Sequence, residues 1–171
     1  MENISLSNGY IFLHAVALIV ALISGYTDLR YRKILNKVSL PAMGIGLILQ
    51  GAFFGLAGLM SAGLGFLIGF GFFFLFYIFG GMGAGDVKLM GALGILLGWQ
   101  DIIYVIIFTG LFGLLVVLIL FFPYIYLAVK TRKASVFMAF RKHYMPYGIA
   151  ISLGTITTLV LRWFFELPAI W

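Results

Sequence analysis

Cysteine is absent from the 171 residues, and charged residues make up only 9% of them. The lack of cysteine excludes disulfides, thiolate metal ligands and a cysteine nucleophile. The two histidines, His14 and His143, stand far apart and form no metal-ligand spacing. Neither a metal nor another cofactor is therefore expected, and His14, inside an apolar run, is interpreted as a packed polar residue.

Apolar residues, in contrast, make up 64% of the chain. A soluble domain is about half apolar and about a quarter charged. A chain this short could not bury so much apolar surface in a core that faces water. The composition therefore predicts an integral membrane protein.

Six apolar stretches approach the roughly 20 residues that a helix needs to cross about 30 Å of hydrocarbon. They cover approximately residues 9–27, 38–56, 60–79, 86–99, 102–127 and 146–167. The sequence thus predicts an all-α integral membrane protein, a single domain over residues 1–171 built as a six-transmembrane-helix bundle. The fourth stretch is short and begins with glycine and polar residues, so we expect its N-terminus to be buried in protein or wetted by a cavity.

The net charge of +6 would suggest a nucleic-acid partner in a soluble protein. In a membrane protein, the positive charge is better explained by basic residues that flank the spans and fix the orientation of these spans. No nucleic-acid partner is therefore expected. With six spans, ten of the eleven cations fall on one side: Arg30, Arg32, Lys33, Lys37, Lys88, Lys130, Arg132, Lys133, Arg141 and Lys142. Because cations collect on the cytoplasmic side, both termini are predicted to lie outside.

This topology places two of the five carboxylate side chains, Asp28 and Asp86, at the same depth, near the cytoplasmic face. Gly83 and Gly85 precede Asp86 and would let another backbone approach it closely. A purely structural alternative is that Asp86 caps the N-terminus of its helix. Lys88 is interpreted as an anchor that reaches the membrane interface, while a role in tuning the Asp86 charge or holding a substrate stays open.

Glycine pairs spaced by four residues, Gly51/Gly55 and Gly65/Gly69, are interpreted as close helix-packing contacts.

Two carboxylates within hydrogen-bonding distance do not both ionise easily. A charged carboxylate can take a proton from water while its protonated partner polarises a carbonyl, as in aspartic proteases. A small transporter or proton pathway could use the same two acids, but stretches 60–79 and 102–127 offer few polar groups to continue it. A structural subunit of a secretion platform, with the acids only capping helices, is a third possibility.

Three segments carry a resemblance to a known family. "GGMGAGDVKLMGALG", residues 80–94, resembles the G-x-G-D segment of the type IV prepilin peptidases, which are membrane aspartic proteases. "DLRYRKILN", residues 28–36, is similar to the family's first-aspartate segment, D-x-R-x-x-x-I-P-N, and "MPYGIAI", residues 145–151, looks like its P-Y-G-x-A segment. Presenilin-like proteases share G-x-G-D but follow it with P-A-L, and the order of segments here favours the prepilin family.

The resemblance implies that Asp28 and Asp86 are catalytic. It implies that the protein cleaves a short basic leader from a prepilin or archaellin-like precursor, just after a glycine, at the cytoplasmic face of the cell membrane. The remaining matched residues are Gly83, Gly85, Lys88, Asn36, Pro146, Tyr147 and Gly148. We expect Asn36 to cap the second span, and Leu35, where the family usually has proline, leaves the shape of that turn open.

Larger members of that family carry paired C-x-x-C motifs and methylate the mature pilin. This sequence has no cysteine and its first apolar stretch begins near Met1, so it resembles the short, peptidase-only members. No methyltransferase activity is expected. Membrane lipid is an expected partner, and the oligomeric state is left open.

Overall fold

The structure is a computed structural model that describes residues 2–131 and 147–165. Every regular element in these residues is an α-helix: α1 (Glu2–Tyr31), α2 (Asn36–Ile78), α3 (Ala84–Thr131) and α5 (Tyr147–Phe165). The predicted all-α class is confirmed. Pro146 and the cations from Arg132 to Lys142 lie outside the described residues.

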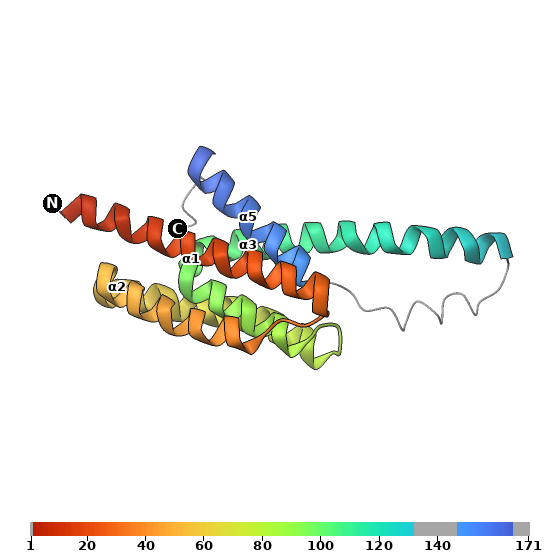
Figure 1. Ribbon diagram of the computed structural model, residues 1–171, viewed down its shortest axis with the longest axis horizontal. Helices are drawn as coiled ribbons and strands as arrows, with labels where there is room; N and C mark the ends of the chain where they lie inside the picture. The colour runs from red at the N-terminus through yellow and green to blue at the C-terminus, as the bar shows by residue number, and fades with distance from the viewer. Residues whose placement is uncertain (1, 132–146, 166–171) are drawn as a thin grey trace.

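Two of the helices are interrupted at a glycine. Gly55 in α2 has φ 60° and ψ −140°, and Gly98 in α3 has φ 78° and ψ 178°. Residues with a Cβ rarely adopt such angles, which explains glycine at both positions. Figure 1 shows the chain reversing direction at each of them, so that α2 and α3 each consist of two helical segments.

Four helices in the described part of the chain are long and apolar enough to cross a membrane: Asn8–Tyr31, Asn36–Ile78, Ala84–Ile119 and Tyr147–Phe164. They indicate a multi-pass membrane protein. The count of six spans and the position of the termini stay predictions.

The first segment of α3, from Ala84 to the Gly98 interruption, forms the centre of the bundle. All residues from Leu89 to Gly98 are buried, and the core cluster includes Val87, Met90 and Leu93. This segment is only about 21 Å long. It packs against α1, α2 and α5. The expected burial of the start of the fourth stretch is confirmed at Asp86 and Val87, whereas Ala84 is exposed.

Glycine lets α2 and α3 approach until their backbones touch. A Cβ on Gly65 would overlap the carbonyl oxygen of Gly94, and one on Gly69 would lie 2.6 Å from the carbonyl oxygen of Met90. The packing role predicted for Gly65 and Gly69 is confirmed. The role predicted for Gly55 is wrong, because this glycine has nothing within 4 Å of its Cβ position and instead supplies the positive φ of the interruption.

The interruption at Gly98 would leave carbonyl groups of the preceding turn without their helical N–H partners. Gln50 on α2 compensates for two of them. Its Nε2 donates to the carbonyl oxygens of Ile95 at 3.2 Å and Leu96 at 3.3 Å. The buried amide of Gln50 therefore stabilises the end of the central segment.

The close contact of Gly65 with Gly94 predicts a sharp cost for one added methyl group. We expect Gly65→Ala to lower the free energy of unfolding by about 1–3 kcal/mol, since an overpacked site must shift backbone. Thermal unfolding of the purified protein in detergent measures this.

Gly63→Ala is the matched control, because Gly63 lies two residues away on the same helix with nothing near its Cβ position. Its unfolding should change by less than about 1 kcal/mol. Equal effects of the two substitutions would contradict the packing described for Gly65.

Candidate active site

Three helix ends meet at one end of the bundle. Asp28 lies in the last turn of α1, Asp86 in the first turn of α3, and Gly148 in the first turn of α5. Figure 1 shows these three ends gathered on the same side. The structure therefore brings together residues from all three matched sequence segments.

The Asp28 side chain is held by the start of α5. Only 1% of Asp28 is exposed, and its Oδ2 accepts a hydrogen bond from the backbone N–H of Gly148 at 2.8 Å. The first N–H groups of a helix lack partners within the helix, and the helix dipole favours a negative charge there. The Gly148 N–H thus both fixes and stabilises the Asp28 carboxylate.

A serine one turn further along α5 keeps this contact in place. Ser152 Oγ lies 2.6 Å from the carbonyl oxygen of Ala21 on α1 and 2.7 Å from that of Gly148. Its hydroxyl hydrogen can donate to either oxygen. Gly25 makes room for this serine, because a Cβ at Gly25 would lie 2.6 Å from Ser152 Oγ.

Asp86 belongs to the first turn of α3 and is 5% exposed. The helix begins at Ala84, so Asp86 is its third residue and not its N-cap. Its Oδ2 accepts a hydrogen bond from the N–H of Gly83 at 3.1 Å, and the Gly83 carbonyl accepts one from the Asp86 N–H, also at 3.1 Å. This is the backward half of a capping box, in which the third residue binds the capping residue.

The capping bond uses only one of the two Asp86 oxygens. Oδ1 is buried and has no hydrogen-bond partner among the described residues. Asp86 lies near both Asp28 and Tyr147, so a charge on either neighbour would repel a charge on Asp86. A cap needs only one carboxylate oxygen and can stay exposed to water. The deep burial of Asp86, with Oδ1 unbonded, is therefore not explained by capping alone.

The short connection between α1 and α2 passes next to Asp86. A Cβ on Gly85 would lie 3.1 Å from Ile34 Cβ, so this glycine permits the approach that the sequence suggested. Leu35 has φ −81° and ψ 123°. These angles are close to those that a proline ring imposes, so leucine preserves the extended turn at this position.

Asn36 does not cap the second span as expected. Leu35 is the N-cap of α2 and no side chain caps it. Asn36 Oδ1 instead accepts a hydrogen bond from Lys88 Nζ at 3.3 Å, which ties the start of α2 to the start of α3. Lys88 is half-buried, so it is a link between helices rather than only an anchor at the membrane surface.

Sequence reasoning missed Ser152 and one further acid. Asp101 is 4% exposed, forms an ion pair with Arg162 and lies 3.5 Å from His14 Nε2. His14 is thus packed, as expected, but against a charge. Acidic residues are rare in this chain, with only five in all, and this rarity was the signal that could have drawn attention to Asp101.

The described residues contain no group of three His, Cys, Asp or Glu side chains that could hold a metal ion.

Long apolar helices around two buried aspartates indicate a multi-pass membrane protein with a candidate site at one end of the bundle. Comparison of the sequence with family models supports a more specific assignment. The model of the type IV leader peptidase family matches residues 15–119, and the chain belongs to this family. No curated protein and no solved structure matches. The protein is therefore a protease with a precursor protein as its substrate, as the resemblance implied.

The contact between Gly148 and Asp28 predicts that Gly148→Ala will impair cleavage of a precursor. The new Cβ would lie 2.7 Å from Asp28 Cβ and 2.8 Å from its Oδ2, so the carboxylate must move. Displacement of a reacting group by about 1 Å can lower a rate by about 100-fold. Cleavage kinetics of the purified variant give the measurement.

Gly44→Ala is its control, because a Cβ on this exposed glycine of α2 meets nothing within 4 Å. The Gly44 variant should cleave at the wild-type rate. If the Gly148 variant also did so, with its fold intact by size-exclusion chromatography, the positioning of Asp28 by Gly148 would be wrong.

Proposed function

We propose that this protein is an aspartic endopeptidase that removes the leader of prepilin-like precursors. In this proposal a water molecule is activated by Asp28 and Asp86. The observation that carries it is the convergence of these two buried acids in a chain of the leader peptidase family. Family membership favours this function over the transporter and the structural subunit.

The two carboxyl groups divide the work of peptide hydrolysis. One is charged and takes a proton from water, whose oxygen attacks the scissile carbonyl carbon. The other is protonated and donates a hydrogen bond to the carbonyl oxygen. When the intermediate collapses, the C–N bond breaks and the leaving amine takes up a proton from the pair.

The hydrogen bonds around Asp28 and Asp86 support a site in which each carboxyl group has its own role. Gly148 N–H and Gly83 N–H each bind one carboxylate oxygen and so restrict the rotation of both side chains. The buried Asp86 Oδ1, which those bonds do not use, is an atom that water or the substrate could contact. Preorganised groups of this kind need little rearrangement during the reaction.

The glycine interruptions and the charges support six spans with the site at the cytoplasmic face. The interruptions at Gly55 and Gly98 give the chain two more reversals than a count of four continuous helices would. Arg30, Arg32 and Lys88 are all near the end of the bundle that holds Asp28 and Asp86. Positive residues mark the cytoplasmic side, which would place both termini outside.

The substrate class follows from the same proposal. A site at the membrane surface, formed by helix ends, suits a bond beside the hydrophobic segment of a membrane-inserted precursor. The family's prepilin and archaellin-like precursors have a short basic leader before such a segment. The leader would then lie on the cytoplasmic side, and the hydrophobic segment would lie along the bundle.

The water-activation proposal predicts that Asp28→Asn and Asp86→Asn each abolish processing of a co-expressed prepilin. Asparagine keeps the size of the side chain and can still accept the backbone hydrogen bonds, but it cannot accept or donate the required proton. The expected loss in cleavage rate is about 10²–10⁴-fold. Immunoblots of precursor and mature pilin, followed by kinetics with purified protein, provide the readout.

Glu2→Gln is the matched control, because it makes the same carboxyl-to-amide change at the start of α1, far from the pair in the sequence. It should process normally. Cleavage at the wild-type rate by either Asp variant would refute the assignment of the pair.

A shared proton also predicts a bell-shaped dependence of the cleavage rate on pH. At low pH both carboxyl groups are protonated and no base is available; at high pH both are charged and no donor is available. The rate should therefore be highest between two limbs that belong to the pair and not to either residue.

The initial cleavage rate of a peptide substrate, measured in buffers of constant ionic strength, tests this. Circular dichroism at each pH checks that the loss of rate at low and at high pH is not caused by unfolding. A rate that rises or falls in one direction only, over the range in which the protein stays folded, would contradict the paired mechanism.

A further inference from the structure

A second group of charged side chains lies at the opposite end of the helices from Asp28 and Asp86. His14 precedes Asp28 by fourteen residues on α1, and Arg162 follows Gly148 by fourteen residues on α5. Each interval corresponds to about 21 Å along a helix. Asp101 follows the Gly98 interruption of α3. The group is therefore separate from the candidate active site.

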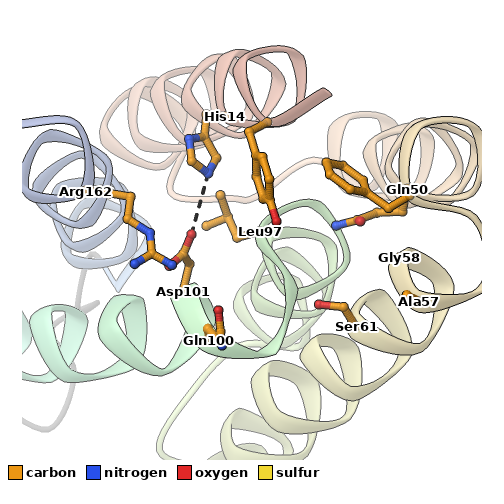
Figure 2. A pocket seen from close by; sticks show the side chains of 11 residues that line it. His14, Gln50, Ala57, Gly58, Ser61, Leu97, Gln100, Asp101 and Arg162 are labelled. Atoms are coloured by element: carbon orange, nitrogen blue, oxygen red, sulfur yellow. Dashed lines mark ion pairs between the residues drawn. The ribbon is translucent and has the colours of Figure 1, made fainter. Parts of the chain in front are cut away.

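One buried carboxylate holds the two basic side chains in place. Asp101 Oδ1 lies 2.9 Å from a terminal guanidinium nitrogen of Arg162, and its Oδ2 lies 3.5 Å from His14 Nε2. The Asp101 side chain is 6% exposed, while that of Arg162 is 24% exposed. Figure 2 shows His14 and Arg162 approaching Asp101 from two other helices. This end of the bundle thus presents a partly accessible guanidinium, held by Asp101, next to the imidazole of His14.

These side chains border a polar cavity of about 420 Å³. Its lining also includes Gln50, Ser61 and Gln100, so hydrogen-bond donors and acceptors are both present. In Figure 2, Ser61 and Gln50 lie across the cavity from Arg162. A cavity of this size and polarity is large enough to hold a polar head group or several water molecules.

An apolar groove of about 400 Å³ adjoins the polar cavity. It runs between α1 and α5 and is lined by Ile11, Leu18, Leu159, Val160 and Trp163, among others. Ile11, Val160 and Trp163 are each more than 40% exposed, at 43%, 45% and 58%. In a membrane protein such side chains face hydrocarbon. His14 belongs to the lining of both spaces, so the polar cavity and the apolar groove meet at this residue.

We propose that the polar cavity and the apolar groove together bind one phospholipid molecule. Its phosphate lies beside Arg162 and His14, and one acyl chain lies in the groove between α1 and α5. A guanidinium matches the geometry of phosphate oxygens and is the side chain most suited to bind them away from bulk water. The groove buries the apolar chain. Gln50, Ser61 and Gln100 accommodate the glycerol and the alcohol of the head group.

The mixed chemistry of the site favours a lipid over the other possible occupants. An inorganic anion would use the polar cavity but leave the groove unexplained. An apolar peptide would use the groove but leave the polar cavity unexplained. A phospholipid has a polar group and an apolar chain that meet at one point, as the two spaces meet at His14.

Lipid binding by the delipidated full chain in detergent tests the proposal, with native mass spectrometry as the readout. The probes are phosphatidylglycerol, phosphatidylethanolamine and a diacylglycerol with the same acyl chains. We expect one phospholipid to bind per chain, and the diacylglycerol, which lacks the phosphate, to bind at least about tenfold more weakly. Equal binding of the diacylglycerol would overturn the proposal.

Two variants separate the two halves of the site. Ala15→Phe fills the groove without changing charge, since Ala15 lines it. The double variant Asp101→Asn with Arg162→Gln removes both members of the ion pair, so that no buried charge is left alone. Each should weaken phospholipid binding by about tenfold or more.

Ala52→Phe is the matched control for the groove. Ala52 is exposed on α2 and lines neither space, so binding should be unchanged. If Ala15→Phe bound phospholipid as wild type does, the proposal would fail, and this variant decides the matter even if the double variant does not fold.

Inorganic phosphate alone is the last probe. Binding of phosphate that depends on Arg162, without retention of any lipid, would identify an anion site and overturn the lipid proposal. Since the readout is binding and not cleavage, the result is independent of the proposed peptidase mechanism.

Discussion

Hydrocarbon offers no hydrogen-bond partners, so every polar group within a membrane bundle must be satisfied by protein or by water. This constraint explains much of the present structure. The interruption of α3 at Gly98 is tolerated because Gln50 binds the carbonyl oxygens of Ile95 and Leu96. Asp28, similarly, is matched to the N–H of Gly148, and Asp101 to Arg162. Each polar side chain in these pairs comes from one helix and its partner from another, so the polar groups also define how the helices assemble.

The same constraint separates the two polar regions of the molecule. Between them lies the central segment of α3, whose residues from Leu89 to Gly98 are buried in apolar contacts. Glycine allows the backbones of α2 and α3 to touch there, at Gly65 and Gly94. The bundle is therefore tightly packed in its middle and polar at its ends. The buried middle follows directly after Asp86 in the sequence of α3.

The parts of this arrangement that depend on local sequence could be predicted. Long apolar stretches identified the helices, and the rarity of acids drew attention to Asp28 and Asp86. The prediction about the start of the second span was wrong, because Asn36 is not a cap and binds Lys88 instead. Gly55 looked like a packing residue because its spacing from Gly51 fits a packing motif, but spacing does not reveal backbone angles.

Other features depend on contacts that no local pattern contains. Gln50 and Ile95, or Ser152 and Ala21, are far apart in the sequence, and their bonds exist only after the helices have packed. Asp101 was present in the sequence as an isolated acid, yet its partners come from α1 and α5. A single sequence reports which residues are unusual. Which residues meet is a property of the packed bundle.

The bond between Gly148 and Asp28 joins residues that are 120 positions apart. Membrane proteins are inserted from the N-terminus onwards as they are synthesised, so α1 and α3 enter the membrane before α5 exists. Until α5 has packed against α1, the Asp28 carboxylate has no Gly148 N–H to hold it. The hydrogen bond that holds the Asp28 side chain therefore forms only after α5 has been made and has packed against α1.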